Sequence, residues 1–191
     1  MNSEEIITQI QNKTTYQLLS KIDKELQDNL NKINSTGSLL PIAKEIIIYI
    51  LSELGDNIEQ HSHSSKIQLF SEIENSAKQI IIFVSDNGIG IPKLFHKHFK
   101  ENNNNWEEIK KALSGISTKG DGRGYGLRTI KKIVEYCEGK MIIVSNGFGY
   151  TIDSKSAEKI KISDTNGTKV AIILPNKLKI TPKEFYKILE G

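Results

Sequence analysis

Three glycine-bearing motifs, each at the end or the start of an apolar segment, constrain the fold of this chain more than any other feature. Residues 53–57 (ELGDN) close a long apolar helix pattern, residues 86–92 (DNGIGIP) follow an apolar strand pattern, and residues 120–127 (GDGRGYGL) open a second helix pattern. Glycine permits sharp turns and close approach of the backbone to other groups. The sequence therefore predicts polar, glycine-bearing segments at a helix end, a strand end and a helix start.

The spacing of apolar residues predicts the remaining elements. Residues 93–119 show no strand pattern and include an asparagine run at 102–105, which predicts a long, mobile connection with one helical stretch. Residues 181–184 (TPKE) form a capping box with proline at the first helical position, which predicts a last helix. The other expected elements are helices over 14–33, 41–61 and 124–138, and strands over 66–70, 79–84, 141–144 and 169–174.

The order of these elements suits one architecture. A helix, two strands, a long connection, a helix and further strands predict a two-layer α/β sandwich, with a mixed sheet and helices on one face. With 191 residues, of which 37% are hydrophobic, the chain can bury a substantial core, and its length favours one domain with short additions. We therefore expect an N-terminal helical extension over residues 1–40 and one domain over residues 41–191.

Composition argues against several classes of function. No run of about 18 apolar residues occurs, and the N-terminus lacks the basic stretch and apolar core of a secretion signal, so we expect a cytoplasmic protein with no membrane partner. The net charge of +3 is too small to indicate nucleic-acid binding. Residues 93–140 hold 11 Lys and Arg against 6 Asp and Glu, either as a solvated basic face or as a surface for phosphates. The single cysteine, Cys137, lies in an apolar helical pattern and allows no disulfide framework.

The first motif carries a stripe of polar residues. Glu53, Asn57 and His61 are spaced by four, so they project from one side of the helix while isoleucines cover another. A carboxylate and an amide on one face can serve a metal–triphosphate group together. The alternative is a solvated polar face, with His61 and Ser62 merely ending the helix.

The second motif places an aspartate at the end of a buried strand. Gly88 and Gly90 follow Asp86 and let the backbone turn sharply and approach a ligand. A carboxylate only accepts hydrogen bonds. Asp86 can therefore accept from the exocyclic amine of adenine, which guanine lacks at that position. A plain strand-ending Asp-Asn-Gly turn is the alternative.

The third motif suits a phosphate chain. Glycines at 120, 122, 124 and 126 precede Leu127 and expose backbone N–H groups at a helix start, where the helix dipole favours anions. Lys119 and Arg123 add cations. The alternative is a flexible glycine linker, but a linker would not usually run directly into an apolar helix pattern.

Together and in this order, the motifs resemble the nucleotide site of the GHKL ATPases, the superfamily of gyrase-type topoisomerases, heat-shock chaperones, histidine kinases and mismatch-repair ATPases. Asn166, Gly167 and Thr168, before the last strand pattern, fit the same family. The resemblance covers roughly residues 41–175 and implies the Bergerat-type ATP-binding fold, with ATP and Mg²⁺ as ligands. It implies Asn57 as the Mg²⁺ ligand and Glu53 as the catalytic general base. The nucleotide-binding positions that it implies are Asn57, Asp86, Gly88, Gly90, Ile91, Lys119, Gly120, Gly122, Arg123, Gly124, Tyr125, Gly126, Leu127 and Thr168.

The resemblance also implies a lid over the nucleotide at residues 93–119. Phe95 and Phe99 are similar to the paired phenylalanines that many histidine kinases carry after the aspartate motif, and Ser117 and Thr118 can reach phosphate oxygens. Closure of this lid would exclude water and hold the γ-phosphate. Trp106 is expected to pack within the lid.

The chain also departs from several branches of the family. No histidine precedes His61, so a conventional autophosphorylating kinase is not expected. Glu53 matches the ATP-hydrolysing branches and the anti-sigma serine kinases, whereas histidine kinases often have asparagine there. Since these residues show no transducer domain of the gyrase type, we do not expect its way of converting hydrolysis into motion. The histidine pairs 61/63 and 96/98 have a spacing compatible with zinc, but neither pair has an acidic or thiolate companion nearby.

Two functions remain open. The first, which we favour, is a signalling kinase that transfers the γ-phosphoryl group of ATP to a separate protein. The second is an ATP-gated protein-interaction module with slow or no hydrolysis. In that case the helix expected over residues 14–33 would be a surface for docking a partner or forming a homodimer, although covering the core is its alternative role.

Overall fold

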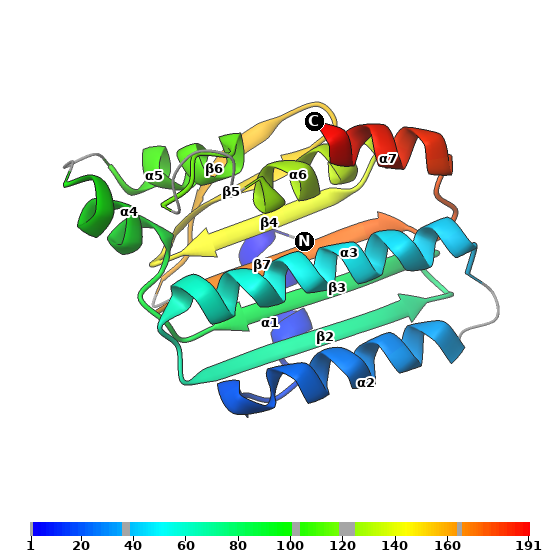
Figure 1. Ribbon diagram of the computed structural model, residues 1–191, viewed down its shortest axis with the longest axis horizontal. Coiled ribbons are helices and arrows are strands. Elements are labelled where there is room, and N and C mark those ends of the chain that lie inside the picture. Colours follow the sequence, from blue (N-terminus) through cyan, green and yellow to red (C-terminus); the bar gives the residue numbers. More distant parts are fainter. Residues whose placement is uncertain (1, 36–38, 101–103, 119–124, 164–165) are drawn as a thin grey trace.

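A seven-stranded sheet forms the centre of the computed structural model (Figure 1), which describes residues 2–35, 39–100, 104–118, 125–163 and 166–191. The strand order is β1-β2-β3-β7-β4-β5-β6, and every neighbouring pair among the described residues is antiparallel. The strands are β1 Gln17–Leu18, β2 Lys66–Glu74, β3 Gln79–Asp86, β4 Lys140–Ser145, β5 Phe148–Asp153, β6 Ala157–Lys161 and β7 Thr168–Pro175.

The predicted α/β sandwich is confirmed, but its sheet is antiparallel rather than mixed. Strands β3 and β4 run in the same direction, as a strand–helix–strand connection predicts. They are not neighbours, because β7 lies between them and pairs antiparallel with both. Ile172 of β7 is opposite Ile82 of β3 on one side and Met141 of β4 on the other. The last strand of the chain thus separates two strands that would otherwise form a parallel pair.

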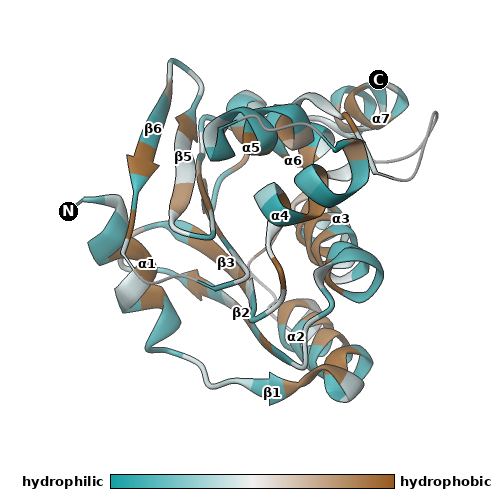
Figure 2. Cartoon of the chain, turned by 90° about the vertical axis from the view of Figure 1, so that its left-hand side faces the viewer, coloured by the Kyte–Doolittle hydropathy of each residue, from teal (hydrophilic) through white to brown (hydrophobic). Residues whose placement is uncertain are grey.

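Most helices cover one face of the sheet and enclose the main core with it (Figures 1 and 2). Helix α3 is apolar over a wide arc, and its Ile46, Ile47 and Ile50 are completely buried. Burying each such side chain contributes about 1.5–3 kcal/mol to folding. The helices that contribute to this core are α2 Ile22–Ser35, α3 Pro41–Asn57, α5 Asn105–Ser114, α6 Gly126–Tyr136 and α7 Pro182–Glu190.

Helix α1 (Ser3–Gln11) lies on the opposite face, so the expectation of helices on one face does not hold for it (Figure 2). Its Ile7 and Ile10 belong to a second apolar cluster with Phe83 of β3. A capping box starts the helix, since Asn2 Oδ1 accepts from the Glu5 N–H and Glu5 Oε2 accepts from the Asn2 N–H, both at 2.9 Å. The capping pair and the isoleucine spacing mark this helix in the sequence, although the first predicted helix begins at residue 14.

The helix predicted over residues 14–33 begins only at Ile22. Gln17 and Leu18 instead form β1, which pairs with the start of β2, and a 3₁₀ turn (Leu19–Lys21) follows. The free edge of β2 supplies hydrogen-bond partners that local helix propensity does not outweigh. Helix α2 then lies beside the rest of β2, where Lys32 Nζ donates to the Ser71 carbonyl at 3.2 Å.

Residues 93–119 hold more structure than the predicted connection. They include most of α4 (Ile91–Phe99) and all of α5, which is joined to the main core by the buried Ile109 and Leu113. Trp106 Nε1 donates to the Ile160 carbonyl at 3.1 Å, and its ring packs edge-on against Phe148 with centroids 4.7 Å apart. Trp106 therefore packs on β5 and β6, not within a lid, and α5 is anchored to the sheet.

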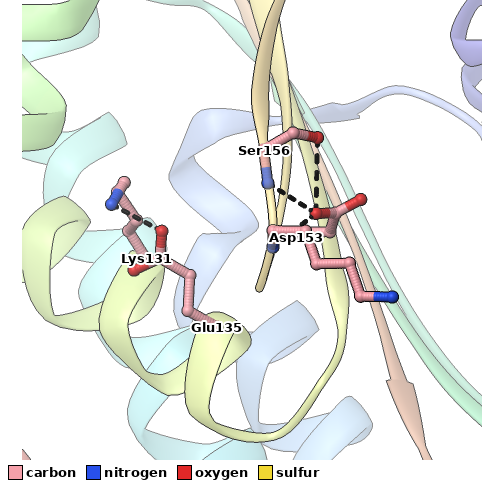
Figure 3. Close-up of polar contacts among 5 residues, drawn as sticks. Lys131, Glu135, Asp153 and Ser156 are labelled. Carbon is pink, nitrogen blue, oxygen red and sulfur yellow. Dashed lines mark hydrogen bonds and ion pairs between the residues drawn. The ribbon is translucent and has the colours of Figure 1, made fainter.

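The predicted strands do not include β5 and β6, which form a hairpin. The carboxylate of Asp153 closes its turn by accepting from the N–H groups of Lys155 (2.8 Å) and Ser156 (2.9 Å) (Figure 3). These backbone hydrogen bonds hold the pKa of Asp153 below its ordinary value. The same view shows Lys131 and Glu135 paired at 2.7 Å, one turn apart on α6.

The predicted C-terminal helix is confirmed as α7, with its capping box between Thr181 and Glu184. Its Phe185 is buried and packs edge-on against Tyr49 of α3, with centroids 6.1 Å apart. Within the described part of the chain, no helix has both the length and the apolar character that crossing a membrane requires.

Candidate functional site

The sequence motifs meet at one end of the sheet. Asp86 ends β3, Thr168 begins β7 and Ser145 ends β4, so the three residues lie at the same end of neighbouring strands. A cavity of about 110 Å³ opens there, beneath the C-terminal part of α3 and the first turn of α6. Its lining residues are Leu54, Asn57, Ile58, His61, Ser62, Val84, Asp86, Gly90, Ile91, Leu94, Phe95, Ala112, Ile116, Ser117, Thr118, Leu127, Ile143, Thr168 and Val170.

Asp86 supplies a buried carboxylate to this cavity. It is only 4% exposed, and its Oδ1 accepts from the Gly88 N–H at 2.7 Å. Burial raises the pKa of Asp86 to about 6, although hydrogen bonds from the N–H groups of Gly88 and Thr168 act in the opposite direction. Ionised Asp86 is therefore costly to bury. A ligand that donates a hydrogen bond to this carboxylate would offset part of that cost.

Gly90 and Ile91 begin α4 beside Asp86. Gly90 has a φ of +79°, and a Cβ on it would overlap the side-chain amide of Asn146. Only glycine satisfies both the backbone angle and the close contact. The fold itself therefore requires glycine at position 90. Close approach of the backbone to a ligand, which the sequence analysis predicts for this motif, would be a second reason.

Ser145 is a residue of the site that the sequence analysis does not predict. Its side chain is completely buried, and its Oγ accepts from the Ile91 N–H (2.8 Å), donates to the Gly167 carbonyl (3.1 Å) and lies 2.9 Å from Thr168 Oγ1. It thereby joins the segment after Asp86 to the segment before β7. A serine that ends an otherwise apolar strand pattern is the signal in the sequence.

The side chain of Glu53, a residue of α3, lies against the first residue of α6. A Cβ on Gly126, the first residue of α6, would overlap Oε2 of Glu53. The first and third motifs therefore meet here, and a side chain at position 126 would displace the Glu53 carboxylate. One turn before Glu53, Tyr49 continues the polar stripe of α3, and this residue is also missing from the sequence analysis.

Asn57 and His61 complete the stripe within the cavity. Asn57 Nδ2 is buried and has no hydrogen-bond partner among the described residues. Turning the amide by 180° exchanges its nitrogen and oxygen with little change of shape, so this position can present a carbonyl oxygen. Mg²⁺ binds oxygen, keeps several waters and takes few protein ligands, so one amide oxygen beside a triphosphate fits it.

Only part of the third motif can be placed. Leu127 lines the cavity, whereas Tyr125 is half-exposed and has the Arg128 guanidinium 5.8 Å from its ring centroid. Helix α6 starts at Gly126, as the motif predicts. The predicted positions Lys119, Gly120, Gly122, Arg123 and Gly124 lie outside the described residues.

Helices α4 and α5 close one side of the cavity. Phe95 lines it and packs against Phe99 with ring centroids 5.5 Å apart. Ser117 and Thr118, which follow α5, line it as well. The carboxylate of Glu108 in α5 is 1% exposed and lies 3.9 Å from His96 Nε2 of α4, which links the two helices. Among the described residues, no three His, Cys, Asp or Glu side chains gather as a metal cluster would require.

Comparisons with known proteins give one matching family. The family of histidine kinase-, DNA gyrase B- and HSP90-like ATPases matches residues 42–178. The N-terminal domain of a DNA repair protein is similar at 16% identity over 80% of this chain and 46% of that chain, with a TM-score of 0.37. The ATP-binding domain of topoisomerase IV from Francisella tularensis, in complex with a small-molecule inhibitor, is similar at 15% identity over 93% and 48%, with a TM-score of 0.39. This chain thus spans slightly less than half of either structure, and no curated protein sequence matches it.

Proposed function

The chain belongs to the family of histidine kinase-, DNA gyrase B- and HSP90-like ATPases, and on that premise we propose that it is a signalling kinase which passes the γ-phosphoryl group of ATP to a separate protein. Family membership makes ATP the ligand of the domain. One observation carries the proposal. Asn57 of α3 and Asp86 of β3 line one cavity, and Glu53, one turn before Asn57, lies against the helix start beside it.

The adenine base fits the Asp86 end of the cavity. The lining is largely apolar there, with Val84, Ile143 and Val170 around the carboxylate. Since Asp86 only accepts hydrogen bonds, it favours the amine of adenine over the carbonyl of guanine. The cavity volume of about 110 Å³ is below the 300–1,000 Å³ (roughly) of most ligand pockets, so the described residues enclose only part of a nucleotide.

The phosphates fit the region between Asn57 and the start of α6. The N–H groups and dipole of a helix start favour anions. Mg²⁺, when bound, neutralises phosphate charge, and the carbonyl oxygen of Asn57 would hold it. Phosphoryl transfer depends mainly on alignment and charge neutralisation, which these groups supply.

Glu53 is the group that accepts a proton in this proposal. Its carboxylate lies against Gly126 at the start of α6, beside the expected place of the phosphates. A carboxylate in that place can take the proton of a protein hydroxyl or of a water as it attacks the γ-phosphorus. Attack by a protein hydroxyl gives kinase activity, and attack by water gives ATP hydrolysis.

An ATP-gated interaction module is the second candidate, and an exposed apolar residue favours it. Ile116 lines the cavity and is also 46% exposed, and Tyr125 is 50% exposed on the surface. A nucleotide that contacts Ile116 would change the apolar surface offered to a partner. In this case ATP binding alone transmits the signal, and Glu53 is not needed for it.

Two measurements test these functions. Titration calorimetry with non-hydrolysable ATP and GTP analogues should show ATP favoured by about ten- to a hundredfold, because guanine would oppose Asp86 with an acceptor. Equal affinities would contradict the assignment of Asp86. Incubation with γ-labelled ATP, Mg²⁺ and a lysate of the source cells should then label a protein band. Tight ATP binding without a labelled band or phosphate release would favour the interaction module.

A further inference from the structure

The hydroxyl of Ser145 makes three polar contacts at the cavity end of the sheet, and the proposed function gives this residue no part in selecting the nucleotide. We propose that Ser145 is a positioning residue, which orients the hydroxyl of Thr168 so that it can only accept a hydrogen bond from the ligand. In this way Ser145 helps to select a base with an amine over a base with a carbonyl at the same position. This inference rests on the proposed adenine site at Asp86.

Ser145 lies inside the protein where three segments meet. It ends β4, its side chain is completely buried, and Thr168 at the start of β7 is directly opposite it. Gly167, the residue before Thr168, lies against Asp86, because a Cβ on Gly167 would be 2.8 Å from Asp86 Oδ1. Both Thr168 and Asp86 line the cavity. They therefore lie together at one corner of it.

The Ser145 hydroxyl has a single proton, which fixes the direction of its hydrogen bonds. A backbone N–H can only donate, so Ser145 Oγ accepts from Ile91 at 2.8 Å. A carbonyl can only accept, so Ser145 donates its proton to Gly167 at 3.1 Å. With that proton used, the 2.9 Å contact with Thr168 Oγ1 is a hydrogen bond only if Thr168 donates.

The opposite direction satisfies fewer of these contacts. If Ser145 donated to Thr168, its oxygen and the Gly167 oxygen would be two acceptors 3.1 Å apart with no proton between them. The Gly167 carbonyl is held in this place, because it also accepts from the Asn146 N–H at 3.1 Å. Buried polar groups are nearly always paired. The direction that pairs every contact is the one in which Thr168 donates to Ser145.

This direction decides what the corner of the cavity offers to a ligand. The one proton of Thr168 is used within the chain, so any hydrogen bond between Thr168 Oγ1 and a ligand is one that Thr168 accepts. Asp86, when ionised, likewise only accepts. The exocyclic amine of adenine has two N–H groups for these two acceptors, whereas a carbonyl oxygen at that position can donate to neither. A buried site discriminates best against a ligand that leaves its polar groups unpaired.

A purely structural role is the competing explanation, in which Ser145 only joins three segments. Ser71 of β2 offers a matched control, since it is 1% exposed and its Oγ donates to Asn29 Oδ1 at 2.8 Å. It too is a buried strand serine with a side-chain hydrogen bond, but its partner belongs to α2 and not to the cavity. Both Ser145→Ala and Ser71→Ala should lower stability, and only Ser145→Ala should change which base is preferred.

The first test compares ADP with inosine diphosphate, which has a carbonyl in place of the adenine amine. Neither nucleotide has a γ-phosphoryl group to transfer, and calorimetry gives the ratio of their affinities. Ser145→Ala should reduce the preference for ADP about three- to tenfold, the contribution of one hydrogen bond, because Thr168 is then free to donate. Ser71→Ala should leave the ratio unchanged. A wild-type ratio in Ser145→Ala, while Asp86→Asn has lost the preference, would overturn this inference alone. A wild-type ratio in Asp86→Asn would instead overturn the adenine site itself.

A second test asks whether Ser145 acts through Thr168. Thr168→Val keeps the shape of the side chain and removes its hydroxyl, so it should also reduce the preference for ADP. Adding Ser145→Ala to Thr168→Val should then change the ratio by less than about twofold, because no hydroxyl is left to orient. If Ser145→Ala does not fold, Ser145→Cys, which keeps the size with a weaker donor, takes its place in both tests. Effects of the two substitutions that simply add would mean that Ser145 does not act through Thr168, and the inference would be wrong.

Discussion

The two ends of the polar stripe along α3 differ in whether their polar groups already have partners. At the N-terminal end, Glu45 is exposed and accepts from the Tyr186 hydroxyl at 3.1 Å. At the C-terminal end, the Asn57 amide nitrogen is buried, lines the cavity and lacks a hydrogen-bond partner within the described ranges. Buried polar groups in folded proteins are nearly always paired. The Glu45 end therefore joins two helices, whereas the Asn57 amide is the group for which we propose a ligand.

Two carboxylates show the same contrast in their electrostatics. Glu184 caps α7 at the surface, where hydrogen bonds from the Tyr136 hydroxyl and from Thr181 lower its pKa to about 2. Asp86 also accepts backbone hydrogen bonds, yet burial raises its pKa to about 6. Both carboxylates accept hydrogen bonds, yet the pKa of Glu184 is lowered and that of Asp86 is raised. Desolvation outweighs the hydrogen bonds only at Asp86, because only this carboxylate is buried. A surface cap is satisfied within the chain, whereas a donor on a bound ligand would offset part of the cost of burying ionised Asp86.

The largest expected effect concerns the chemistry proposed for Glu53. Glu53→Ala should lower phosphate release or transfer by about 10²–10⁴, the usual contribution of a positioned general base. The Kd for ATP should stay within a few-fold, because no contact of Glu53 with the base or the ribose is expected. Steady-state turnover and calorimetry on the same preparation check both parts. Wild-type turnover in this variant would remove Glu53 from the reaction.

The next effect concerns binding at Asp86. Asp86→Asn keeps the size but turns one acceptor into a donor that faces the adenine amine, so ATP affinity should fall about ten- to a hundredfold. Calorimetry with a non-hydrolysable analogue measures this loss. Unchanged affinity would exclude Asp86 from the adenine site.

The same variant should be more stable than the wild type without nucleotide. Because the folded-state pKa of Asp86 is raised to about 6, the wild type loses stability as the pH rises through about 6. The amide of the Asp86→Asn variant has no charge to bury, so this variant should gain about 3 kcal/mol in unfolding free energy at pH 7–8, from about two pKa units at about 1.4 kcal/mol each. Below about pH 4 the difference should vanish, because Asp86 is then protonated in both the folded and the unfolded chain. Urea unfolding at both pH values is the measurement, and an equal difference at both would contradict the assigned cause.

A smaller effect separates the metal from the nucleotide. Asn57→Ala should weaken Mg-ATP binding by about tenfold, the loss of one good ligand, and should leave the affinity for ATP in EDTA nearly unchanged. The measurement is the ratio of the two affinities. Equal losses with and without Mg²⁺ would mean that Asn57 contacts the nucleotide directly.

The elements that sequence predicts well are those specified by local patterns. The periodicity of α3 and α6 and the capping box of α7 depend on residues within one element, and they give the correct helices. Strand β1 replaces the start of a predicted helix because β2, about fifty residues away, offers an edge. The placement of β7 between β3 and β4 likewise depends on pairing over long distances along the chain.

The residues of the candidate site likewise differ in whether a local sequence pattern predicts them. Glu53, Asn57 and Asp86 belong to contiguous motifs, so their type and spacing are visible in the sequence. Ser145 and Tyr49 make contacts that exist only in the folded chain. Ser145 joins Ile91 to Gly167 across three segments, and the ring of Tyr49 packs edge-on against Phe185. No spacing rule within one segment identifies such residues.

The smallest expected effect tests the paired end of the stripe. Glu45→Ala removes the acceptor of an exposed hydrogen bond between α3 and α7, and exposed interactions of this kind contribute about 0–1 kcal/mol. The unfolding free energy should therefore fall by less than about 1 kcal/mol, with no change in ATP affinity or turnover. Urea unfolding and calorimetry on Glu45→Ala and Asn57→Ala together make the comparison. If Glu45→Ala weakens Mg-ATP binding as much as Asn57→Ala does, the two ends of the stripe are coupled. A hydrogen-bond partner within the chain would then not distinguish a structural residue of α3 from a ligand-binding one.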